Sequence, residues 1–193
     1  MNRRQKRSDK EPSVLPYLEQ LPPQNIEAEM AVLGSMLIEE DAISQVLEII
    51  DENTFYKDAH KKIFSSIVNL YDQRKAVDLI TLVERLKNDN ALEGVGGASY
   101  LTALTNVVPT AANVVHYARI GREKNILRLL INNATRIVTD AYDTEEDVDE
   151  VFDRAEKMIF EISDRRVEGG FVSIKEIIKD SIEAIDKLYQ HKT

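Results

Sequence analysis

Residues 117–162 read YARIGREKNILRLLINNATRIVTDAYDTEEDVDEVFDRAEKMIFEI, and their pattern decides the fold. Apolar side chains recur at steps of three and four residues on both sides of a short acidic break, the spacing of one helix face. The break is polar and brief, so the chain must turn back on itself and form an antiparallel helical hairpin over residues 112–166. The repeating positions are Tyr117, Ile120, Leu127, Ile131, Ala134, Val138 and Ala141, interrupted at Lys124, and then Val148, Phe152, Ala155, Ile159 and Ile162.

Two helices bury only the stripe where they meet, so further apolar residues of the hairpin need another partner. These residues are Ile126, Leu129, Leu130, Ile137, Val151 and Met158. The rest of the same chain or a second copy could cover them, and the spacing alone does not decide between the two.

The remaining sequence also has helical periodicity, with no sustained alternation of apolar and polar residues that would indicate strands. We therefore predict an all-α fold, a small helical bundle followed by the hairpin and a hinged linker helix. Stripes led by Leu33 and Ile63 should face one bundle core. The expected helices span about 25–38, 41–50, 58–73, 78–89, 97–107, 112–142, 147–166 and 173–190.

The predicted organisation has five parts. Residues 1–24 form a basic, proline-rich tail that we expect to be disordered. A globular bundle (25–111) and the hairpin (112–166) follow, and paired glycines mark a hinge at 167–172. Residues 173–193 then form an amphipathic helix, whose docking face would consist of Ile174, Ile178, Ile182, Ile185 and Tyr189.

Five blocks, taken in order, resemble the N-terminal domain of bacterial replicative DNA helicases, the DnaB family. They are LPPQNIEAEMAVLG (21–34), TFYKDAHKKIF (54–64), VDLITL (77–82), GGASYL (96–101) and VPTAANV (108–114). The resemblance covers roughly residues 21–172, and the last predicted helix looks like the family's linker helix.

This resemblance implies a function in assembly. In DnaB-like proteins the hairpins pair, three such dimers form the collar of a hexameric ring, and the primase C-terminal domain docks on its rim. By that analogy the hairpin residues Ile126, Leu129, Leu130, Val151 and Met158 form the oligomer interface, and Tyr100, Ile131 and Ile137 are candidate primase contacts. The linker helix would dock on the motor domain of a neighbouring subunit. ATP and magnesium belong to that RecA-like motor domain, which we expect to be absent here.

Charge disfavours DNA binding by the body of this chain. The first 24 residues carry five basic and three acidic side chains, a net of +2, so the rest of a chain of net −9 carries −11 and would repel phosphate. No apolar run suggests a membrane span or signal peptide, and there is no cysteine, so we expect a cytoplasmic protein.

The sequence gives little support for catalysis. His60, His116 and His191 lack a second histidine at metal-pair spacing, and no Gly-x-x-x-x-Gly-Lys-Ser/Thr motif is present to bind a nucleotide. The acidic runs 39–41 and 145–147 look like solvated helix starts. We therefore expect no catalytic residue, cofactor or metal in this chain. The main hypothesis is the non-catalytic assembly and primase-recruiting domain of a replicative helicase; the alternative is a free-standing helical adaptor without a motor.

Overall fold

The computed structural model describes residues 21–143 and 147–166, and every regular element in these ranges is a helix or a 3-10 turn. The predicted all-α class is therefore confirmed. The elements are α2 (Ile26–Ile38), α3 (Asp41–Leu47), η1 (Glu52–Thr54), α4 (Asp58–Asp72), α5 (Leu79–Asn88), η2 (Glu93–Val95), α6 (Gly97–Val107), η3 (Ala111–Asn113), α7 (Val114–Asp143) and α8 (Val148–Arg166).

Most of the predicted tail, the hinge at 167–172 and the linker helix with its docking face of Ile174, Ile178, Ile182, Ile185 and Tyr189 lie outside the described residues. The three 3-10 turns were not predicted.

Polar caps start several helices where the sequence leaves a loop. Asn25 accepts a hydrogen bond from the backbone N–H of Ala28 (2.9 Å), which begins α2 directly after the proline pair at 22–23. Asp78 accepts from the N–H of Thr81 (2.8 Å) while the Thr81 hydroxyl accepts from the N–H of Asp78 (3.1 Å), a reciprocal cap at the start of α5. These caps satisfy amide groups that have no partner within the helix.

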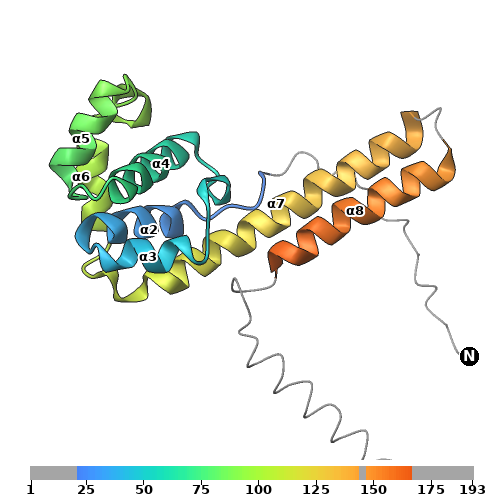
Figure 1. The fold of residues 1–193 in the computed structure, drawn as a ribbon, viewed down its shortest axis with the longest axis horizontal. Coiled ribbons are helices and arrows are strands. Elements are labelled where there is room, and N and C mark those ends of the chain that lie inside the picture. Colours follow the sequence, from blue (N-terminus) through green and yellow to red (C-terminus); the bar gives the residue numbers. More distant parts are fainter. Residues whose placement is uncertain (1–20, 144–146, 167–193) are drawn as a thin grey trace, which may run out of the picture.

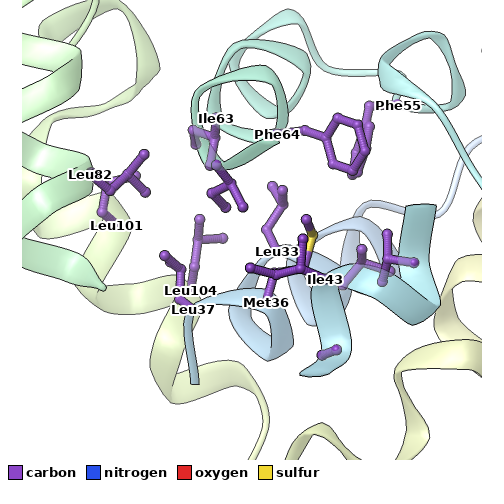
Figure 2. Close-up of a cluster of buried hydrophobic side chains, with 14 of the residues drawn as sticks. Leu33, Met36, Leu37, Ile43, Phe55, Ile63, Phe64, Leu82, Leu101 and Leu104 are labelled. Carbon is purple, nitrogen blue, oxygen red and sulfur yellow. The ribbon is translucent and has the colours of Figure 1, made fainter. Parts of the chain in front are cut away.

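Helices α2 to α6 gather at one end of the molecule around a single apolar core (Figure 1). The stripes predicted on α2 and α4 meet there, with Leu33 and Ile63 fully buried (Figure 2). Helix α2 also packs very closely on α6. A Cβ atom on Gly34 would lie 2.2 Å from the carbonyl oxygen of Leu104, so only glycine permits this approach.

Helix α7 belongs to both the bundle and the hairpin. Its first turns lie under the bundle, where Val114 and Ala118 are buried, and its outer part extends away from α2 to α6 (Figure 1). At 1.5 Å per residue, its 30 residues span about 45 Å. Helix α8 runs back beside the outer part of α7, as expected for an antiparallel hairpin (Figure 1).

Candidate interaction surfaces

The contact between α7 and α8 uses a different stripe from the one that the sequence suggested. Met158, expected to lie outside this contact, is buried at 8% exposure, and its carbonyl oxygen accepts a hydrogen bond from the Asn133 side chain (3.0 Å). Arg154 pairs with Asp140 across the same contact (3.1 Å). The seam between the two helices therefore follows the less exposed positions Ile126, Leu129, Asn133, Ile137 and Asp140 of α7, and Val151, Arg154, Met158 and Ile162 of α8.

Most of the expected seam lies instead on the surface, although among its α8 members Ala155 is half-buried and Ile162 is buried. Val138 is 54% exposed and Phe152 is 62% exposed, and they belong to the outward stripe Leu127, Leu130, Ile131, Ala134, Val138, Val148, Phe152 and Ile159. The interpretation of the two stripes is thus reversed. Each helix carries two 3,4 stripes one residue apart, and polar Asn133, Asp140 and Arg154 made the inner one look less apolar in the sequence.

This reversal changes where the predicted interface residues lie. Met158 is not accessible to another copy, because the two helices of its own hairpin bury it. Ile126, Leu129 and Val151 are half-buried in the same seam. Leu130 remains 44% exposed and lies with the outward stripe.

The outward stripes of α7 and α8 face the same side of the hairpin. One residue advances a helix by about 100°, and on each helix the exposed positions come one residue after seam positions: Leu127 follows Ile126, and Ile159 follows Met158. The two helices run in opposite directions, so a rotation of about 100° from the seam turns the exposed stripe of each helix toward the same side of the hairpin. The hairpin therefore presents one broad apolar face. We call the eight residues of the outward stripe the hairpin face.

An open groove of about 720 Å³ runs along α8 at the edge of this face. Phe152, Ile159 and Phe160 supply most of its apolar lining, with Glu156 and Lys157 beside them. Such a contiguous exposed apolar surface on a water-facing helix is typical of a protein–protein contact.

The primase-contact candidates lie on different parts of the molecule. Ile131 is 49% exposed on the hairpin face, whereas Ile137 is half-buried in the seam. Tyr100 belongs to α6 in the bundle and is half-buried. The structure does not bring Tyr100 together with the two isoleucines in one patch; α6 and the outer part of α7 lie at opposite ends of Figure 1.

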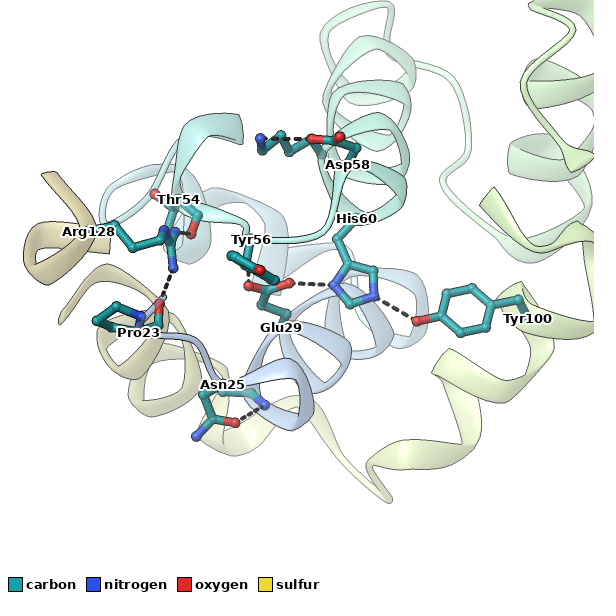
Figure 3. Close-up of polar contacts among 11 residues, drawn as sticks. Pro23, Asn25, Glu29, Thr54, Tyr56, Asp58, His60, Tyr100 and Arg128 are labelled. Atoms are coloured by element: carbon teal, nitrogen blue, oxygen red, sulfur yellow. Dashed lines mark hydrogen bonds and ion pairs between the residues drawn. The ribbon is translucent and has the colours of Figure 1, made fainter. Parts of the chain in front are cut away.

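Tyr100 leads into a buried polar chain that sequence reasoning missed. Its hydroxyl lies 2.7 Å from Nε2 of His60, and Nδ1 of His60 lies 2.6 Å from Oε2 of Glu29 (Figure 3). Oε1 of Glu29 accepts the backbone N–H of Tyr56 (2.7 Å). His60 and Glu29 are buried, so these bonds replace the water that both polar groups have lost.

Arg128 of α7 ties the hairpin to the bundle. Its guanidinium donates to the carbonyl oxygens of Pro23 (2.7 Å) and Thr54 (2.5 Å), and it lies over the ring of Tyr56 at 5.8 Å (Figure 3). Burial lowers the pKa of Arg128, while the negative charge of Glu29 opposes that change. No pattern in the sequence marks this residue, because its partners lie 74 and 105 residues away.

Within residues 21–143 and 147–166, no group of three or more histidine, cysteine or acidic side chains could hold a metal ion. Neither does any helix in those ranges have the length and apolar character to cross a bilayer. His60 is taken up by the buried chain, and His116 is exposed at the start of α7.

The fold and these surfaces define a helical bundle with a projecting hairpin and an uncovered apolar face. A family model described as the DnaB-like helicase N terminal domain matches residues 21–123. The chain belongs to this family, as the resemblance indicated.

Curated relatives and solved structures agree with this assignment. The chain is 42% identical to the replicative DNA helicase DnaC of Bacillus subtilis over 174 residues, covering 90% of this chain and 38% of the relative. The replicative DNA helicase DnaB of Geobacillus stearothermophilus gives the same identity over 173 residues, with the same coverage. The chain thus spans well under half the length of these relatives.

The crystal structure of the N-terminal domain of DnaB helicase from Mycobacterium tuberculosis superposes with a TM-score of 0.71 at 41% identity, covering 73% of this chain and 99% of that one. A DnaB-like replicative helicase, described with its interactions with primase, shares the fold at a TM-score of 0.64 and 24% identity, covering 84% of this chain and 36% of that one.

Proposed function

We propose that this chain is a non-catalytic assembly and primase-recruiting domain of a replicative DNA helicase. One observation carries the proposal: the hairpin face, a broad apolar surface on helices that project from the bundle. Membership of the DnaB-like family supports a place in a helicase that unwinds DNA with ATP and magnesium held elsewhere in the whole protein. We place its action in the cytoplasm, where bacterial DNA is copied.

The hairpin face pairs with a second copy of the chain. Apolar side chains such as Val138 and Phe152 lose contact with water when two hairpins pack together, and burying them contributes about 25 cal/mol per Å². The same face on both copies makes a twofold contact, the commonest arrangement of homodimers. Three such dimers would then build the collar of a hexameric ring, with the linker segment 173–193 reaching the motor of a neighbouring subunit.

Primase would dock on the rim of this collar. Ile131 is 49% exposed in the single chain, and a docking role requires that pairing of two hairpin faces leaves it accessible at the rim. Tyr100 presents part of its ring outward while its hydroxyl bonds inward to His60. DNA is not expected to bind strongly, since the body of the chain carries a net negative charge.

The primase proposal is tested by titrating this chain with the C-terminal domain of a primase in a calorimeter. We expect saturable binding to the wild-type chain and at least tenfold weaker binding to Ile131→Asp, compared at a concentration where both have the same molar mass by light scattering. The exposed helix position Glu84 of α5 gives a matched control, because Glu84→Ala leaves both proposed surfaces intact. Absence of binding to the wild-type chain would contradict primase recruitment and leave self-association to its own test.

A further inference from the structure

The buried polar chain crosses the whole bundle. It begins at Tyr100 on α6, passes through His60 on α4 and Glu29 on α2, reaches Tyr56 in the loop before α4, and ends at Arg128 on α7 (Figure 3). These contacts link four helices and one loop. Within the bundle the partners are 27, 31 and 40 residues apart in sequence, and the last pair, Tyr56 and Arg128, is farther apart.

Both ends of this chain respond to the same central charge. Burial raises the pKa of Tyr100, and the Glu29 carboxylate raises it further. Burial lowers the pKa of Arg128, and Glu29 opposes that shift. Glu29 is itself only 3% exposed, so its interactions with the two ends are poorly screened by water.

Hydrogen-bond directions leave little freedom in this arrangement. An ionised Glu29 only accepts, so Nδ1 of His60 donates to it, and the Tyr100 hydroxyl is the partner of the second ring nitrogen, Nε2. Removing that hydroxyl leaves Nε2 without its hydrogen-bond partner inside a fully buried ring. We expect the ring to move toward another partner and the Glu29 carboxylate, which is bonded to it, to move with it.

Arg128 holds the point where α7 leaves the bundle. Its two carbonyl acceptors belong to Pro23, which precedes α2, and Thr54, which lies two residues before Tyr56. A displacement of the loop at 54–56 therefore moves both an acceptor of Arg128 and the ring beneath it.

We propose that this polar chain fixes the orientation of the α7–α8 hairpin relative to the bundle. A change at Tyr100 then alters that orientation through His60, Glu29 and Arg128. Tyr100 acts here as a positioning residue, because its hydroxyl bonds to His60 and not to Arg128 or to the Pro23 and Thr54 carbonyls that Arg128 holds. The proposal is independent of self-association, since every contact in it lies within one copy.

The test measures the distance between bundle and hairpin with pairs of spin labels. The chain has no cysteine, so Lys87→Cys on α5 and Glu150→Cys on α8 introduce two labelling sites, both exposed. Labelled protein is diluted tenfold or more into unlabelled protein, which suppresses distances between copies. Double electron–electron resonance then gives the distribution of distances within one copy.

We expect a single narrow distribution for the wild-type chain. Arg128→Lys keeps the positive charge but loses the forked donors, and should broaden the distribution to at least twice its width. Tyr100→Phe should broaden or shift it as well, although Tyr100 lies on α6. The matched control is Tyr71→Phe, a hydroxyl deletion on α4 outside the polar chain, and it should leave the distribution unchanged.

Circular dichroism at the measuring temperature establishes that each variant is folded. Broadening by Tyr100→Phe but not by Tyr71→Phe supports the proposal. An unchanged distribution in a folded Tyr100→Phe variant overturns it, whether or not Arg128→Lys broadens the distribution. A broad distribution in the wild-type chain overturns it too, because the hairpin then has no fixed orientation relative to the bundle.

Discussion

Glu29 is a buried acidic residue that bonds to two segments distant from it in the sequence. An isolated carboxylate in an apolar junction is costly, and here two donors stabilise it, His60 from α4 and the Tyr56 N–H from the following loop. The sequence could not reveal this site, because Glu29 reads as an ordinary acidic residue in the first turn of α2 and its partners lie 27 and 31 residues away. The caps at Asn25 and Asp78 involve neighbours in sequence, and residues of this type are recognisable from local pattern alone.

Replacing Glu29 with glutamine should destabilise the chain. Glutamine offers one acceptor oxygen where the carboxylate offers two, and its amide N–H₂ would face a donor. We expect the free energy of unfolding to fall by about 1–3 kcal/mol, as for a buried hydrogen bond left unsatisfied. Urea denaturation followed by circular dichroism measures this loss. Glu27→Gln, on the exposed side of the same helix turn, should change stability far less, and equal losses at both positions would contradict the account.

Tyr100 should make stability depend on pH in the alkaline range. Burial raises the pKa of its phenol in the folded chain above the ordinary value of 10.0, so folding favours the protonated form. That contribution is complete below the pKa of the unfolded chain and is lost as pH rises through the folded pKa. We expect the melting temperature to fall less steeply above about pH 10 in Tyr100→Phe than in the wild-type chain. Tyr142→Phe, which removes an exposed phenol, should follow the wild-type curve.

At the scale of elements, the helices themselves were predictable and their pairing was not. Every described helix was anticipated within a few residues, because its 3.6-residue periodicity and flanking polar residues are local signals. The choice of stripe in the hairpin was predicted wrongly. The sequence predicts the more apolar stripe of each helix as the seam. The helices instead meet along the neighbouring stripe, one residue earlier, where Asn133 and Arg154 form hydrogen bonds between them.

Gly34 offers a prediction in which local propensity and packing have opposite signs. Alanine is favoured over glycine within a helix by about 1 kcal/mol, yet the added Cβ would collide with the Leu104 carbonyl and force α2 away from α6. We expect Gly34→Ala to lower the free energy of unfolding by about 1–3 kcal/mol, the usual cost of overpacking. Thermal melts measure it. Gly94→Ala is the matched control, because no atom lies within 4 Å of its added Cβ, and a stable Gly34→Ala variant would show that the two helices are less tightly apposed.

At the scale of the whole molecule, most apolar residues of the bundle are buried, whereas the outer part of the hairpin exposes a continuous stripe of them. The described residues of α2 to α6 and the first turns of α7 enclose one core, whereas the outer part of α7 and α8 bury only the seam between them. The family and the all-α class could be inferred from sequence blocks and periodicity. The hairpin face could not be assigned to particular residues, since exposure depends on which of two neighbouring stripes the partner helix covers.

The most direct test of this account is the molar mass of the chain in solution, measured by sedimentation equilibrium over a hundredfold range of concentration. We predict a mass at or above that of a dimer for the wild-type chain, and at least tenfold weaker association for Phe152→Glu, which places a charge on the hairpin face. Lys87→Glu, which changes the charge at an exposed position of α5 in the bundle, should associate like the wild-type chain. A wild-type chain that remains monomeric throughout, or a Phe152→Glu variant that associates normally, would contradict the central claim that the hairpin face joins two copies.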